Sequence, residues 1–127
     1  MRRETVVTVL VCAAALTACT GPGEPAFVSD RPSLEPCGTV TLGQGETVPT
    51  EAWTCFDAAA ATGAELVVSR PTTEGDPIVT YYRAGPGITG VEVLTDTTAD
   101  AFGPRTWTHE LCARMDGAHD PRDCRTV

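Results

Sequence analysis

The sequence predicts an α+β fold in which one helix packs on an antiparallel meander of about four strands, stapled by disulfides. Three observations support this prediction. One stretch carries apolar residues at helical spacing, later stretches alternate with a period of two, and four cysteines remain beyond the amino-terminal segment. A length of 127 residues leaves room for one domain.

The first 18 residues have the pattern of an export signal. Arg2 and Arg3 precede an apolar run over 6–18. This run is shorter than the roughly 20 residues that a membrane-spanning helix needs. The sequence Leu16-Thr17-Ala18-Cys19 resembles the lipobox of bacterial lipoproteins. The resemblance implies that residues 1–18 are a lipoprotein signal peptide. It also implies that Cys19 carries a palmitate-type lipid, which anchors the exported protein to the extracytoplasmic face of the cell membrane.

Residues 19–36 are rich in proline and glycine and predict a tether. Such a composition favours extended chain, so the 17 residues after Cys19 could reach roughly 50 Å. We expect the folded domain to occupy residues 37–127. Removal of residues 1–18 takes away two arginines and one glutamate, which changes the net charge from −8 to −9. The chain has no lysine, and this acidic balance argues against a nucleic-acid partner.

The domain opens with a short extended run over 39–42 and a glycine turn at 43–45. Trp53, Phe56 and Ala60 then predict an amphipathic helix that begins at Thr50 and ends at Gly63. Apolar alternation and proline or glycine breaks predict strands at 65–70, 78–83, 91–95 and 105–114. One helix followed by several strands indicates the α+β class.

Four cysteines remain after Cys12 and Cys19 are set aside: Cys37, Cys55, Cys112 and Cys124. An even set in an exported chain predicts two disulfides with three possible connectivities. A local scheme pairs the first two and the last two cysteines. A nested scheme pairs Cys55 with Cys112 and Cys37 with Cys124. We favour the nested scheme, because longer closed loops constrain the unfolded chain more strongly.

Two motifs between residues 63 and 112 are candidate recognition features, namely the stretch "TTEGDPI" from Thr72 to Ile78 and the stretch "DTTADAFG" from Asp96 to Gly103. In these motifs the segment resembles a family of small uncharacterised lipoproteins from Gram-positive bacteria. The resemblance implies an extracytoplasmic lipoprotein domain and no known activity.

A possible partner-binding surface combines the loop residues Thr73, Glu74 and Asp76 with Tyr81 and Tyr82. The two tyrosines are consecutive in a predicted strand, so their side chains point to opposite faces, and one of them is free to meet a partner. Glu74 and Asp76 could also do acid/base chemistry, but an exposed loop provides no burial to shift their pKa. We expect a turn in which these residues support the backbone.

Asp96, Thr98 and Asp100 form a candidate metal site, because they occupy alternate positions as in the first half of a calcium loop. The glycine and glutamate of the second half are replaced by Ala101 and Trp107, so we expect an ordinary Asp/Thr turn.

A second metal candidate consists of His109, Cys112, His119 and Cys124, whose residue types are those of zinc sites. Disulfides are the better interpretation of these cysteines in an oxidising compartment. We therefore expect no resident metal and no cofactor.

The sequence contains no catalytic set. After Cys19 the serines are Ser29, Ser33 and Ser69, and none stands in a nucleophile elbow. We therefore expect a small lipid-anchored binding or accessory module whose partner is a protein or an envelope component. The alternatives are a small metal-dependent or acid/base enzyme and an envelope structural protein.

Overall fold

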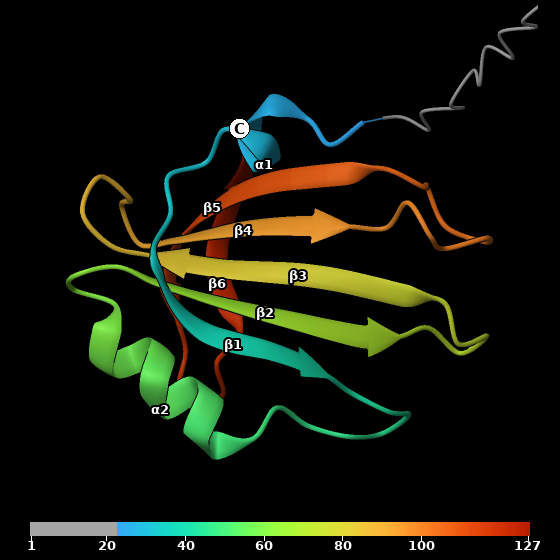
Figure 1. The fold of residues 1–127 in the computed structure, drawn as a ribbon, viewed down its shortest axis with the longest axis horizontal. Helices are drawn as coiled ribbons and strands as arrows, with labels where there is room; N and C mark the ends of the chain where they lie inside the picture. The colour runs from blue at the N-terminus through green and yellow to red at the C-terminus, as the bar shows by residue number, and fades with distance from the viewer. Residues whose placement is uncertain (1–22) are drawn as a thin grey trace, which may run out of the picture.

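The computed structural model describes residues 23–127, which form a curved six-stranded sheet with one helix at each of two faces (Figure 1). In chain order the elements are α1 (Ala26–Ser29), β1 (Glu35–Thr41), α2 (Thr50–Ala59), β2 (Ala64–Pro71), β3 (Pro77–Ala84), β4 (Val91–Asp96), β5 (Trp107–Met115) and β6 (Pro121–Thr126). The strand order in the sheet follows the order in the chain.

The α+β class is confirmed, but the sheet is mixed and has six strands where about four antiparallel ones were predicted. β1 pairs with β2 in parallel, and every later pair is antiparallel. The reason is that α2 lies between β1 and β2. A helix returns the chain to the end of the sheet at which it started, so the next strand runs in the same direction.

The sixth strand, β6, lies in a tail that the sequence analysis left without secondary structure. Half of its residues Pro121–Thr126 are charged and nearly all are exposed, so they lack the apolar alternation that identifies a strand. Pairing with β5 and a covalent link through Cys124 hold the segment in the sheet.

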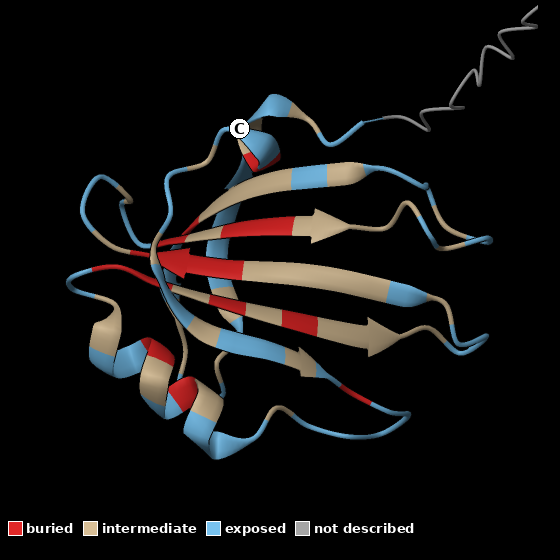
Figure 2. Cartoon of the chain, viewed as in Figure 1, coloured by how far each residue is buried: buried red, intermediate tan, exposed pale blue. Residues whose placement is uncertain are grey.

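The main core lies between the sheet and α2. Trp53 and Phe56 point from α2 onto Leu66 and Val68 of β2, as the helical spacing predicts. Buried residues accordingly lie on α2 and on β2, β3 and β4 (Figure 2). Tyr82 also belongs to this core, where its ring meets Trp53 edge-on at 5.2 Å between ring centroids.

The sheet curls so that its last hairpin returns to α2. His119, in the turn between β5 and β6, stacks on Trp53 with 4.4 Å between ring centroids and an interplanar angle of 5°. Its Nε2 lies 3.0 Å from a carboxylate oxygen of Asp57 on α2. His119 is therefore packed against α2.

The opposite face of the sheet is covered by α1 and the residues around it. Val28 is fully buried, Phe27 stacks on His109 at 4.9 Å, and Arg31 lies 4.8 Å above the ring of Tyr81. These residues belong to the stretch 19–36 that was expected to be an extended tether. The domain therefore starts near residue 26, since one buried valine and the Arg31 contacts hold the segment on the sheet.

The disulfides join Cys37 to Cys55 and Cys112 to Cys124, so the nested scheme favoured from the sequence is wrong. Cys55 lies on the helix beside β1, and Cys112 and Cys124 are direct partners in the β5–β6 register. Loop entropy affects only the unfolded chain, whereas the fold decides which sulfur atoms meet. Two disulfides indicate an oxidising, extracytoplasmic environment.

Across residues 23–127 there is no helix with both the length and the apolar character needed to cross a membrane.

Candidate functional site

A buried arginine is the centre of the most polar part of the molecule. Arg83 on β3 is only 2% exposed. Its Nε lies 2.9 Å from Glu65 on β2, its Nη1 donates to Glu92 on β4, and its Nη2 donates to the carbonyl oxygen of Pro32. Burial of a charge is costly unless it is paired, and here every branch of the guanidinium has a partner.

The contacts of Arg83 extend in both directions across the sheet. Glu65 also accepts two hydrogen bonds from Arg31, at 3.0 and 3.2 Å, and Glu92 lies 2.8 Å from Nε2 of His109. We call these five side chains, which are Arg31, Glu65, Arg83, Glu92 and His109, the ion-pair row. The row lies on the sheet face opposite α2, because its strand members alternate with core residues such as Leu66 and Tyr82.

At the Arg31 end of the ion-pair row, Glu65 is held in its charged form. Burial alone would raise the pKa of Glu65, but the hydrogen bonds and positive charges of Arg31 and Arg83 outweigh it and lower that pKa below 4.5. The hydrogen bond to Glu65 likewise raises the pKa of Arg31. Beside them, burial raises the pKa of Tyr81. The ion pair between Arg31 and Glu65 therefore stays charged at neutral pH.

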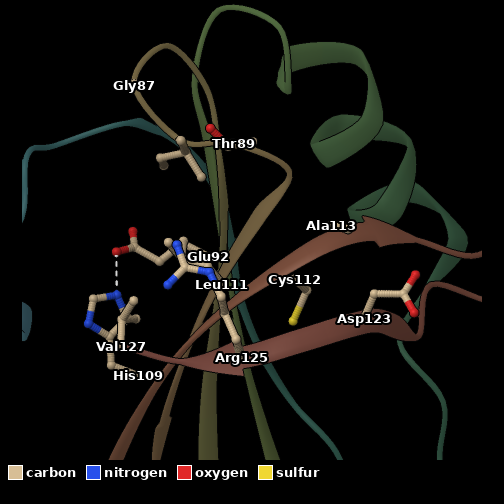
Figure 3. A pocket seen from close by; sticks show the side chains of 11 residues that line it. Gly87, Thr89, Glu92, His109, Leu111, Cys112, Ala113, Asp123, Arg125 and Val127 are labelled. Atoms are coloured by element: carbon tan, nitrogen blue, oxygen red, sulfur yellow. Dashed lines mark hydrogen bonds and ion pairs between the residues drawn. The ribbon is translucent and has the colours of Figure 1, made fainter.

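At its other end the ion-pair row opens into a pocket of about 370 Å³. Glu92 and His109 form its polar floor, Leu111 adds an apolar surface, and the β3–β4 loop forms a rim (Figure 3). The Arg125 side chain extends from β6 toward the Glu92–His109 pair. Among residues 23–127, no carboxylate forms an ion pair with Arg125. The pocket thus presents one positive charge that is available to a ligand.

A glycine allows the rim of this pocket to form. Gly90 has a φ of +80°, and a Cβ at this position would lie 2.1 Å from the carbonyl oxygen of Cys112. Only glycine fits such a close approach, so the β3–β4 loop rests directly against β5.

The pocket lining combines charged side chains with apolar ones. Its lining includes no serine, and its one cysteine, Cys112, is held in a disulfide. Both carboxylate oxygens of Glu92 already have partners in the ion-pair row.

The predicted partner surface is divided by the fold. Thr73 and Glu74 are exposed at the tip of the β2–β3 loop, but Asp76 accepts a hydrogen bond from the backbone of Ala101 at 2.9 Å. Tyr82 is in the core, and Tyr81 on the other face is covered by Arg31 and approaches Trp107 at 5.9 Å. Tyr82 is therefore a core residue, Tyr81 is partly exposed, and a partner-binding role for these residues stays a prediction.

The Asp96–Asp100 segment forms the expected turn. Asp96 Oδ1 accepts hydrogen bonds from the backbone and the hydroxyl of Thr98 at 2.8 and 2.6 Å, and Asp100 accepts one from the backbone of Phe102 at 2.9 Å. These oxygens serve the local backbone.

The second metal candidate is dispersed. Cys112 and Cys124 are bonded to each other, His109 pairs with Glu92, and His119 pairs with Asp57. Within the described range 23–127, no three His, Cys, Asp or Glu side chains are grouped so that they could hold a metal ion. The predicted lipid site, Cys19, lies outside the described residues.

The sequence analysis missed the ion-pair row, although a signal was present. Glu65, Arg83 and Glu92 are charged residues with apolar or aromatic neighbours in their strands. Charged residues inside strands are rarely fully buried unless they are paired. Two acids and one arginine in three successive strands are therefore a pattern that could have indicated a buried cluster.

No family model, no curated protein and no solved structure matches this chain in comparisons with known proteins.

Proposed function

We propose that this protein is a lipid-anchored binding module on the extracytoplasmic face of the cell membrane, with its ligand site in the pocket at the end of the ion-pair row. The anchor is the lipid on Cys19. The ligand is an acidic group of a protein or envelope partner, bound by Arg125 beside Glu92 and His109.

One observation carries the binding role, namely an unpaired arginine in a pocket whose other charges are already fixed. Asp123, which also lines the pocket, lies 3.4 Å from Arg114, and Glu92 is engaged by Arg83 and His109. Arg125 is left without an ionic partner among the described residues. A guanidinium can bind a carboxylate or phosphate through two hydrogen bonds, and Leu111 offers an apolar contact beside it.

The cellular location rests on two independent features. The lipobox-like sequence before Cys19 supplies the expected processing site. The two disulfides agree with an oxidising compartment. A single acyl chain holds a protein only marginally, whereas a diacylglycerol supplies two chains and holds it durably.

Labelled palmitate tests the anchor. We expect the wild-type chain, produced in a bacterium with lipoprotein processing, to incorporate the label and to lose residues 1–18. The Cys19→Ala variant should incorporate none. A wild-type protein that remains unlabelled would contradict the proposed anchor.

Photocrosslinking in cells tests the pocket. A photoreactive residue is placed at Thr89 on the pocket rim, at Thr73 in the β2–β3 loop, or at Ala58 on the exposed side of α2 as a control. We expect a discrete adduct from position 89 that disappears in the Arg125→Glu variant. An adduct from position 73 alone would transfer the binding role to the β2–β3 loop.

The second candidate is an acid/base enzyme, which the Glu92–His109 pair favours. A carboxylate that orients an imidazole is a recurring arrangement of general bases. This candidate predicts that His109→Gln abolishes a turnover that Arg125→Gln leaves measurable. Identical effects of the two substitutions on ligand retention, without turnover, would exclude it.

A further inference from the structure

Phe102 is the most exposed large hydrophobic side chain in residues 23–127. It is 80% exposed, at the tip of the β4–β5 loop that runs from 97 to 106. A single exposed apolar side chain is common on protein surfaces. The position of Phe102 relative to the proposed lipid anchor is what indicates a contact.

The loop holds Phe102 in a fixed position. Asp100 accepts a hydrogen bond from the Phe102 backbone at 2.9 Å, and Asp76 of the neighbouring loop accepts one from Ala101 at 2.9 Å. At the base of the loop the backbone of Thr97 donates to Thr106 at 2.9 Å. The ring is therefore presented on a supported turn.

The described chain begins beside this same loop. Gly23 lines a mostly apolar cavity of about 330 Å³ together with Phe27, Arg105 and Trp107. Cys19 precedes Gly23 by four residues. Four fully extended residues span at most about 14 Å, so a lipid on Cys19 must lie within about that distance of Gly23 and close to the loop.

The packing of α1 makes this proximity unavoidable. If residues 19–36 were an extended tether, the domain could turn any face to the membrane. Because Val28 is buried and Arg31 is bonded to Glu65, only the few residues that precede α1 remain as a connection. A lipid on Cys19 would therefore hold the end of the sheet that carries the β4–β5 loop nearest to the membrane.

We propose that the β4–β5 loop contacts the membrane, with Phe102 inserted among the lipid headgroups and Trp107 at the base of the contact. The inference rests on the proposed lipid anchor at Cys19. Aromatic side chains favour the membrane interface. The acidic domain is repelled by anionic lipid, so the contact depends on the apolar ring.

A photoreactive phenylalanine analogue, p-benzoylphenylalanine, tests the contact with little change of shape. It replaces Phe102 in the full-length lipidated protein, reconstituted in phosphatidylcholine vesicles. The matched control carries the analogue at Ala61, an exposed position at the opposite end of the strands. We expect a phospholipid adduct by mass spectrometry from position 102, at a yield at least tenfold above that from position 61.

A second pair of proteins isolates the role of the ring. The analogue is placed at Ala99, an exposed position in the same loop, with residue 102 either wild type or changed by Phe102→Ser. The serine variant should lower the lipid adduct at least fivefold, because the loop loses its apolar contact.

The outcomes separate this inference from the proposed function. Intact mass measurement first shows whether Cys19 carries lipid. If it does, equal yields from positions 102 and 61 contradict the membrane contact and leave the anchor intact. If it does not, the proposed anchor is wrong and this inference fails with it.

Discussion

Replacement of Val28 by alanine gives a sharp test of whether the segment 26–36 is part of the folded domain. Val28 is fully buried between α1 and the outer face of the sheet, where Leu94 is also fully buried. In an extended tether the same substitution would change no contact. The free energy of unfolding therefore distinguishes the packed segment from the predicted tether.

The expected effect follows from the atoms that are removed. Val28→Ala deletes two buried carbon atoms, and each contributes about 0.8 kcal/mol to the free energy of unfolding. The cavity that remains adds a further cost, because neighbouring side chains relax only in part. We expect a total loss of about 2 kcal/mol.

Urea unfolding measures this loss. The Cys19→Ala background removes the lipid, and tryptophan fluorescence reports unfolding through Trp53 and Trp107. With a dependence on urea of about 2 kcal/mol per molar, the midpoint should fall by about 1 M at an unchanged slope. Ser29→Ala is the control, since this exposed neighbour should change stability by less than about 0.5 kcal/mol. Equal midpoints for the two variants would refute the packing of α1.

Three further predictions concern charged residues. Arg83→Met should lower the free energy of unfolding by about 3–5 kcal/mol, because two partly buried acids lose their common partner. The control Arg70→Met removes only a 3.3 Å contact with a tyrosine hydroxyl and should lower the free energy of unfolding much less. Similar losses in the two variants would contradict the role of the ion-pair row. The pKa of Glu65 is lowered on folding, so the stabilisation by its carboxylate is present above the unfolded pKa of about 4.5 and is lost as the pH falls through the lower folded value. In urea unfolding, the stability difference between wild type and Glu65→Gln should therefore be complete at pH 7 and shrink below about pH 4.5. A difference that stays constant to pH 2 would be inconsistent with this linkage. Hydrogen bonds from the Asp120 backbone and from Arg122 lower the pKa of Asp116 to about 2. Carboxyl NMR should give this titration midpoint in wild type and a higher midpoint, still below 3.8, in Arg122→Gln. An unchanged midpoint would exclude Arg122 as a cause of the lowered pKa.

The elements that could be predicted are those whose sequence has a clear period. Trp53 and Phe56 at helical spacing predicted α2 and its buried side, and apolar alternation predicted β2, β3, β4 and β5. Such periods depend on the local backbone geometry and on which side of the element is buried, so they can be recognised without knowledge of the fold. The turn at Asp96 was also predicted, because short acidic side chains bond to their own backbone.

The elements that were missed depend on distant partners. β6 is polar and exposed, and only its pairing with β5 makes it a strand. α1 has four residues, and it is held by Val28 and Arg31 against strands far along the chain. No local pattern indicates such contacts. The sequence analysis therefore predicted no strand at 121–126 and assigned the residues of α1 to a tether.

The residues of the candidate site likewise fall into those that a local sequence pattern indicated and those that it did not. The acids of the β2–β3 and β4–β5 loops were visible as clusters in the sequence, and the fold uses most of them to support turns. Arg83, Glu92 and Arg125 were not singled out, because they stand on three different strands and belong to no short motif. Strand pairing brings Glu92 beside Arg83, and the curl of β5 and β6 carries Arg125 to the pocket.

For this protein, local sequence patterns were sufficient to predict the α+β class, the main helix, the middle strands and the existence of two disulfides, and they also predict the lipid anchor. These features depend on local periods and on the number of suitable residues. Contacts between distant residues set the parallel pairing of β1, the partners of the cysteines, the ion-pair row and the position of α1 on the sheet. Each of these depends on which distant residues the fold brings within a few ångströms, and short-range interactions act only at that distance.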